Sequence, residues 1–171
     1  MNIKSFAHQV VYFCIGLFII FFQILPLQTI PQTWSGPNVL LVFFAAIVSK
    51  RPEFTSSFLI AGIFLIEDFF LMRPPGLMSS LTVLGFYFLK RKFQNQERNS
   101  FLFGWGSVTT CLSIVLLFYY FISVLLFIPS AGFKLTLMEL IVTLALYPIF
   151  SVLIGSLDKL NLTEAEKTIQ R

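Results

Sequence analysis

Charged side chains are scarce in this 171-residue chain. Only 12% of its residues are Asp, Glu, Lys or Arg, whereas a typical soluble domain has about 25%. Hydrophobic residues make up 57%, phenylalanine alone occurs 22 times, and the mean hydropathy is +0.85. A soluble domain of this length could not bury so much apolar surface. The composition therefore predicts an all-α integral membrane protein.

Histidine and cysteine are nearly absent. His8 is the single histidine, and the two cysteines, Cys14 and Cys111, lie inside separate apolar stretches. A lone histidine cannot form a catalytic pair, and a disulfide framework or a metal site needs more ligands at closer spacing. The sequence therefore predicts no enzyme active site, no cofactor and no metal.

The net charge of +4 does not indicate a nucleic-acid partner. The basic residues lie between apolar runs, and no basic face with interleaved aromatic residues is present. We therefore expect no nucleic-acid binding.

Six apolar runs predict a bundle of six transmembrane helices. They cover residues 10–25, 37–49, 54–72, 76–89, 101–128 and 135–155. The second run is short: as a helix it reaches about 21 Å, less than the roughly 30 Å of a bilayer core. Pro37 and Asn38 open this run, and proline is favourable at the first helical position because its missing N–H would be unpaired there.

The runs form one membrane domain over residues 1–156, because no connecting segment is long enough to separate two domains. A short cytoplasmic tail follows over residues 157–171. Thr163 and Glu166 have the spacing of a capping box, which favours a short surface helix in this tail.

Basic residues are distributed unequally between the two sides of the predicted bundle. Two of them, Arg73 and Lys134, follow the third and fifth runs. The other ten precede the first run or follow the second, fourth and sixth: Lys4, Lys50, Arg51, Lys90, Arg91, Lys92, Arg98, Lys159, Lys167 and Arg171. Cytoplasmic loops are enriched in Lys and Arg. Both termini are therefore expected in the cytoplasm, as an even number of spans requires.

Four ionisable residues lie near the outer ends of the predicted helices: Glu67, Asp68, Arg73 and Glu139. Asp68 shares a helix face with Phe64, Ala61 and Ser57, and small residues allow another helix to approach. Glu67 shares a bulkier face with Ile63, Ile60 and Ser56. We therefore expect Asp68 to face the bundle and Glu67 to lie nearer its rim or a partner protein.

Three interpretations of these acids stay open. They could dock a partner or form internal hydrogen bonds, or they could only mark the outer interface, with Arg73 neutralising one of them. Proton or ion translocation has less support, because no further acids line a path inward.

The order of several short motifs resembles the MreD family of bacterial rod shape-determining membrane proteins. The matching residues are Gly36-Pro37-Asn38, Lys50-Arg51-Pro52, Ala61-Gly62, Asp68, Gly76 and Tyr147-Pro148. The RPPGL stretch at residues 73–77 is similar to alphaproteobacterial members. The likeness covers nearly the whole chain and is most specific from Pro37 to Leu89.

The resemblance implies a scaffold rather than an enzyme, in the machinery that builds the lateral cell wall at the bacterial inner membrane. It implies association with MreC and, further, with MreB, RodA and the elongation penicillin-binding transpeptidase. It also implies a fold like the six-helix substrate-binding components of energy-coupling vitamin transporters. The alternative function is a small-molecule- or lipid-binding subunit of a membrane transporter.

The residues expected to carry these roles fall into two groups. Candidates for partner binding or structure are Pro37, Asn38, Glu67, Asp68, Arg73, Pro74, Pro75, Gly76 and Glu139. The cytoplasmic basic loop comprises Lys90, Arg91, Lys92 and Arg98, and is expected to contact MreB or anionic membrane lipid.

Overall fold

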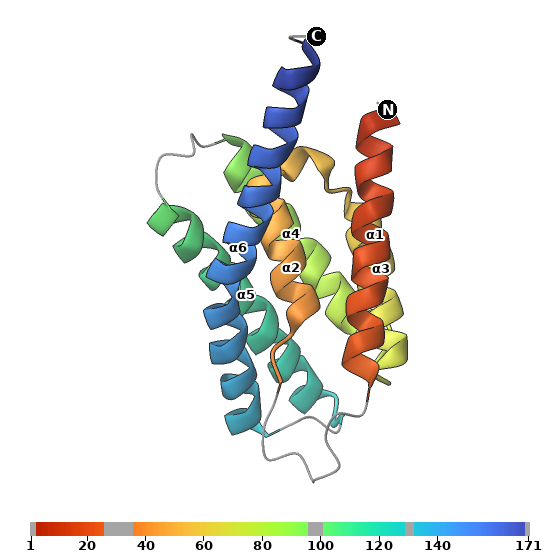
Figure 1. Cartoon of the computed structure of the whole chain (residues 1–171). Coiled ribbons are helices and arrows are strands. Elements are labelled where there is room, and N and C mark those ends of the chain that lie inside the picture. The colour runs from red at the N-terminus through yellow and green to blue at the C-terminus, as the bar shows by residue number, and fades with distance from the viewer. Residues whose placement is uncertain (1–2, 26–35, 96–100, 129–131, 170–171) are drawn as a thin grey trace.

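The computed structural model describes residues 3–25, 36–95, 101–128 and 132–169, and every regular element within these ranges is helical (Figure 1). This confirms the all-α fold class. The elements are α1 (Ile3–Ile24), α2 (Val39–Lys50), the 3₁₀ helix η1 (Pro52–Phe54), α3 (Ser57–Phe70), α4 (Leu77–Asn95), α5 (Phe101–Leu125) and α6 (Phe133–Ile169).

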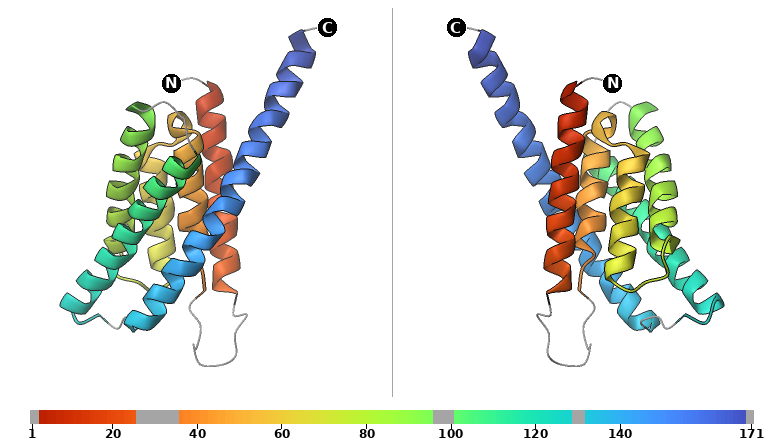
Figure 2. Two further views of the ribbon diagram at one scale, coloured as in Figure 1. Left: turned by 90° about the vertical axis from the view of Figure 1, so that its left-hand side faces the viewer. Right: turned by 90° about the vertical axis from the view of Figure 1, so that its right-hand side faces the viewer.

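Successive α-helices run in opposite directions, so that α1 begins and α6 ends at the same end of the bundle (Figure 2). Lys50 and Lys92 lie in the last turns of α2 and α4 and therefore belong to this end, which we call the basic end. The opposite end holds the α3–α4 turn and the start of α6. We call it the acidic end, because Glu67, Asp68 and Glu139 lie there.

Helix α2 occupies the centre of the bundle. All its residues from Leu40 to Ser49 are buried, and it contacts α1, α4, α5 and α6. A helix that is hydrophobic all round is expected in an interior position. Its 12 residues span about 18 Å. The apolar run at residues 37–49, which was predicted to be short for a membrane span, is therefore a helix enclosed by longer neighbours.

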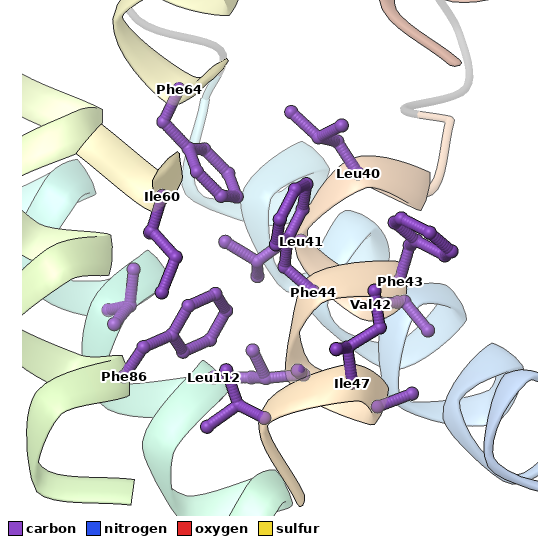
Figure 3. Packing of buried hydrophobic residues seen from close by; sticks show 14 of the residues in the cluster. Leu40, Leu41, Val42, Phe43, Phe44, Ile47, Ile60, Phe64, Phe86 and Leu112 are labelled. Atoms are coloured by element: carbon purple, nitrogen blue, oxygen red, sulfur yellow. The ribbon is translucent and has the colours of Figure 1, made fainter. Parts of the chain in front are cut away.

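Phenylalanine rings connect four of the helices through the core, and Figure 3 shows those of Phe43, Phe44, Phe64 and Phe86. Phe43 of α2 meets Phe150 of α6 at 6.4 Å between ring centroids, and Phe44 of α2 meets Phe64 of α3 at 5.8 Å. Phe64 in turn meets Phe86 of α4 at 6.1 Å. All three pairs are edge-to-face, which is a favoured geometry worth about 0.5–1.5 kcal/mol beyond the area buried.

The start of α2 differs slightly from the prediction. Asn38 is the N-cap, and its Oδ1 accepts a hydrogen bond from the Leu41 N–H at 3.0 Å. The Asn38 N–H donates to Thr143 Oγ1 of α6 at 3.1 Å. Pro37 therefore precedes the cap instead of occupying the first helical position, because the asparagine side chain satisfies the first turn better.

The end of α6 also differs. The helix contains Pro148 and continues without a break to Ile169. The predicted end near Gly155 and the separate short helix beginning near Thr163 are therefore wrong. The residues after Gly155 are mostly polar in the sequence, but they include neither a proline nor a further glycine that would end the helix.

Among the residues that the structure describes, two helical stretches are long and apolar enough to cross a membrane, Phe103–Leu125 and Phe133–Ser156, whereas His8–Ile24 and Val39–Lys50 are shorter apolar helices. Large apolar side chains are exposed on the outside of the bundle, among them Phe18 and Phe21 of α1 and Phe118 and Phe121 of α5. Many exposed large apolar side chains on a helical bundle are compatible with contact with lipid or with another protein.

Candidate functional site

The turn between α3 and α4 is organised by Asp68. Its Oδ2 accepts hydrogen bonds from the N–H groups of Gly76, at 3.1 Å, and Ser79, at 3.2 Å. Its main-chain carbonyl accepts from the Arg73 N–H at 3.0 Å. Ser79 lies in the first turn of α4, so the carboxylate binds an otherwise unpaired helix N–H and is favoured by the helix dipole. Asp68 therefore links the end of α3 to the turn and to the start of α4.

The intervening sequence suits this geometry. Gly76 has φ +93°, a backbone conformation that residues with a side chain rarely adopt, and Met72 has φ +50°. Pro74 and Pro75 each fix φ and lack an N–H, and the Pro74 carbonyl accepts from the Leu77 N–H at 3.2 Å. The turn is thus limited to few conformations by its own residues as well as by Asp68.

The expected orientation of Asp68 is confirmed, since its side chain is 0% exposed. However, the small residues on the same helix face, which were expected to pack closely against another helix, are not all buried. Phe64, one turn earlier on the same face, is buried, but Ala61 is half-buried and Ser57 is exposed. These small residues border a cavity of about 460 Å³ between α3 and α4, with Ser79, Ser80 and Val83 opposite them.

The expected position of Glu67 at the rim is wrong. Glu67 is 0% exposed, and Ile60 and Ile63 on the same face are buried with it. The bulky face of α3 fills the interior of a bundle whose core is built from large side chains, and the smaller face is the more open one. Among the described residues, neither carboxylate oxygen of Glu67 has a hydrogen-bond partner.

A cavity of about 210 Å³ lies beside the α3–α4 turn and brings the other ionisable residues together. Its polar lining consists of Arg73, Tyr119, Tyr120, Thr136 and Glu139. The Arg73 guanidinium carbon lies 5.7 Å from the centroid of the Tyr119 ring, a cation–π contact. We call this cavity the acidic-end pocket.

The charges of Arg73, Asp68 and Glu139 all act on Glu67. The structure therefore unites the four ionisable residues that the sequence singled out, although they come from three segments. Thr136, Tyr119 and Tyr120 were not among the candidate site residues of the sequence analysis. Their proximity to Arg73 depends on how α5 and α6 pack, which no local pattern encodes.

Exposed apolar side chains surround the turn. Phe69 and Phe70 at the end of α3 are 64% and 59% exposed, and Met72 is 95% exposed. We call Phe69, Phe70 and Met72 the apolar tip. The apolar tip lies next to the turn whose backbone is fixed by the Asp68 hydrogen bonds.

The basic loop has structural contacts of its own. Lys90 Nζ donates to the Thr55 carbonyl at 2.5 Å, and Lys92 Nζ lies 4.8 Å from the centroid of the Phe103 ring. Arg91 is exposed, and Arg98 lies outside the described residues. Two of the four basic side chains thus help to attach the end of α4 to its neighbours.

In the described parts of the chain, these features define a helical bundle with two helices long and apolar enough to cross a membrane and a buried carboxylate that organises one end. Within the described ranges, no group of three or more His, Cys, Asp or Glu could hold a metal ion. The chain matches no protein-family model, no curated protein and no solved structure.

Proposed function

We propose that this chain is a non-enzymatic scaffold of the bacterial inner membrane that binds MreC in the cell-wall elongation complex, as its resemblance to the MreD family implies. Through MreC it would help to organise MreB, RodA and the elongation penicillin-binding transpeptidase in lateral peptidoglycan synthesis. The observation that carries the proposal is the Asp68-bound turn, which presents an exposed apolar tip on fixed backbone.

The proposed membrane arrangement has six spans with both termini in the cytoplasm. Its support is the alternating direction of the six α-helices together with the concentration of Lys and Arg at the end where α1 begins and α6 ends. Helices α2 and α3 are shorter than a bilayer core, but α2 is enclosed by the bundle, and local thinning or helix tilt accommodates such differences.

The proposed docking surface for MreC is the acidic end, at the outer face of the membrane. A fixed apolar surface loses little conformational entropy when a partner binds, which favours affinity. The membrane-proximal part of MreC would contact the apolar tip and the turn from Arg73 to Leu77.

Co-purification tests this proposal. Asp68→Ala releases the turn and Arg73→Glu reverses the charge beside it, so each should reduce the MreC recovered with the protein in mild detergent by at least about tenfold, the size of a substantial interface contact. Recovery is normalised to the amount of folded protein, measured by its melting in detergent.

Glu53→Lys is the matched control. Glu53 is an exposed acid in η1 at the basic end, so its replacement changes charge without touching the docking surface. Unchanged MreC recovery and normal rod shape in both acidic-end variants would remove the proposal.

The second candidate function is a small-molecule- or lipid-binding subunit of a membrane transporter, and the acidic-end pocket is the observation in its favour. However, the pocket measures about 210 Å³, below the roughly 300–1,000 Å³ of most small-molecule sites. A vitamin-sized ligand that survives purification and is identified by mass spectrometry would favour transport over the scaffold.

The basic loop is proposed to contact cytoplasmic MreB or anionic lipid. Each basic residue near an anionic membrane surface contributes about 1 kcal/mol of attraction. Attraction to anionic lipid is therefore sufficient to explain why four basic residues occur in this loop. If neutralising Lys90, Arg91, Lys92 and Arg98 alters topology and leaves MreB association unchanged, lipid is the partner.

A further inference from the structure

Helix α3 ends in a tight turn that is closed by two main-chain hydrogen bonds. The Arg73 N–H donates to the Asp68 carbonyl at 3.0 Å, and the Met72 N–H donates to the Phe69 carbonyl at 3.3 Å. These two bonds define the Schellman motif, in which the residue after the helix cap is left-handed and is usually glycine. Here that residue is Met72, with φ +50°.

Helix α5 ends at the same end of the bundle and in the same motif (Figure 2). The Ile128 N–H donates to the Ser123 carbonyl at 2.9 Å, and the Phe127 N–H donates to the Val124 carbonyl at 3.2 Å. The left-handed residue is Phe127, with φ +54°. Within the described parts of the chain, Met72 and Phe127 are the only residues other than glycine with a positive φ.

Both left-handed residues carry large apolar side chains that lie open on the surface. Met72 is 95% exposed and Phe127 is 96% exposed. A residue with a β-carbon is strained in this conformation, and glycine would avoid both the strain and the exposed apolar area. Backbone strain of this kind is concentrated at sites that bind a partner or a substrate. The pair therefore indicates a surface that another molecule covers.

The two turns border one pocket. Met72 and Arg73 of the α3–α4 turn and Ile128 of the α5–α6 turn all line the acidic-end pocket. Charged and hydroxyl groups line it too, among them Arg73, Tyr120 and Glu139. The hydrocarbon chains of lipid offer such groups no hydrogen bonds. A protein segment that carries both apolar and polar side chains suits the mixed surface better than lipid chains do.

We propose that the α3–α4 and α5–α6 turns form one docking surface, on which Met72 and Phe127 contact a single amphipathic segment of a partner protein. This inference deepens the proposed scaffold function by adding a second turn to the docking surface that contains the apolar tip. It rests on that function for the identity of the partner, whose contacting segment would be the membrane-proximal part of MreC.

Site-specific photo-crosslinking in intact cells tests the surface whatever the partner is. Met72, Phe127 and Phe58 of the full chain are replaced one at a time by p-benzoylphenylalanine. Phe58 is the matched control, because it is 90% exposed and lies at the start of α3, at the basic end. Mass spectrometry should identify the same segment of MreC crosslinked to positions 72 and 127, and position 58 should not crosslink to it.

Glycine variants separate binding from folding. Met72→Gly and Phe127→Gly remove the apolar side chain and also relieve the left-handed strain, so the melting temperature in detergent should stay the same or rise. Each should nevertheless reduce MreC recovery at least about fivefold, the scale of an interface residue. Phe58→Ala should leave recovery unchanged.

The outcomes distinguish the docking surface from the scaffold function. Crosslinks from positions 72 and 127 to different proteins, to lipid alone or to nothing would overturn the two-turn surface. Unchanged MreC recovery in Phe127→Gly, with reduced recovery in Asp68→Ala, would do the same and leave the scaffold function standing. If both positions crosslink to one segment of another protein, the surface stands and the assignment of MreC is wrong. A lower melting temperature in both glycine variants would show that the two side chains support the fold, against the proposal.

Discussion

The two ends of the bundle handle charge in opposite ways. At the basic end, cationic side chains lie at the bundle surface, where Lys90 and Lys92 brace α4 against Thr55 and Phe103. At the acidic end, Glu67 and Asp68 are wholly buried. Long basic side chains can keep their charge in water while their stems cover apolar surface, whereas short carboxylates cannot.

This difference indicates that the two ends are suited to different roles. Surface cations at one end are suited to fixing orientation in a membrane, because they resist transfer across it. A buried carboxylate such as Asp68, at the other end, is suited to fixing the backbone, because few conformations satisfy its hydrogen bonds. The predictions that follow test the two ends against each other.

The largest expected effect is an all-or-none difference in accessibility between the ends. In a Cys14→Ala, Cys111→Ala background, Pro75→Cys places a thiol at the exposed acidic end and Gln94→Cys places one at the exposed basic end. A membrane-impermeant maleimide should label Pro75→Cys in spheroplasts and should label Gln94→Cys only after the membrane is permeabilised. Labelling of Gln94→Cys in intact spheroplasts would contradict the proposed six-span arrangement.

Asp68→Ala should produce the largest loss of stability of any single substitution of an acidic residue at either end. It removes the acceptor of two backbone N–H bonds, those of Gly76 and Ser79. Hydrogen bonds to a charged group contribute about 1.5–3 kcal/mol each, so the free energy of unfolding should fall by at least about 3 kcal/mol. Equilibrium unfolding in mixed micelles with increasing sodium dodecyl sulfate provides the measurement.

Glu53→Ala is the control for this change at the basic end. Its carboxylate is exposed, and substitutions at such positions usually alter stability by less than about 0.5 kcal/mol. A similar loss in both variants would mean that the Asp68 hydrogen bonds do not stabilise the turn.

The helical core could largely be predicted from the sequence. Apolar runs placed all six α-helices, because burial of apolar side chains and helix formation act on the same contiguous residues. The prediction failed where a boundary lacked a strong local signal. No proline or glycine follows Gly155, and α6 therefore continues to Ile169.

The candidate site was harder to predict. The helix-face argument placed Asp68 correctly in the interior. It placed Glu67 at the rim, because small residues were expected to mark the packed face of the helix. In this bundle Ile60, Ile63 and Phe64 fill the interior instead. The approach of Tyr119 and Glu139 to Arg73 depends on the packing of α5 and α6 and has no signal in any single segment.

Glu67→Leu sharpens the comparison within the acidic end, because it should change stability in the opposite direction from Asp68→Ala. Asp68 satisfies main-chain donors, whereas the described residues offer no hydrogen-bond donor to Glu67. Replacing a buried, unpaired polar group by an apolar one of similar size removes its desolvation penalty, about 1–3 kcal/mol on the scale of protein mutations. The unfolding free energy in the same micelle assay should therefore rise by about 1–2 kcal/mol. A fall in stability instead would show that the Glu67 carboxylate supports the fold.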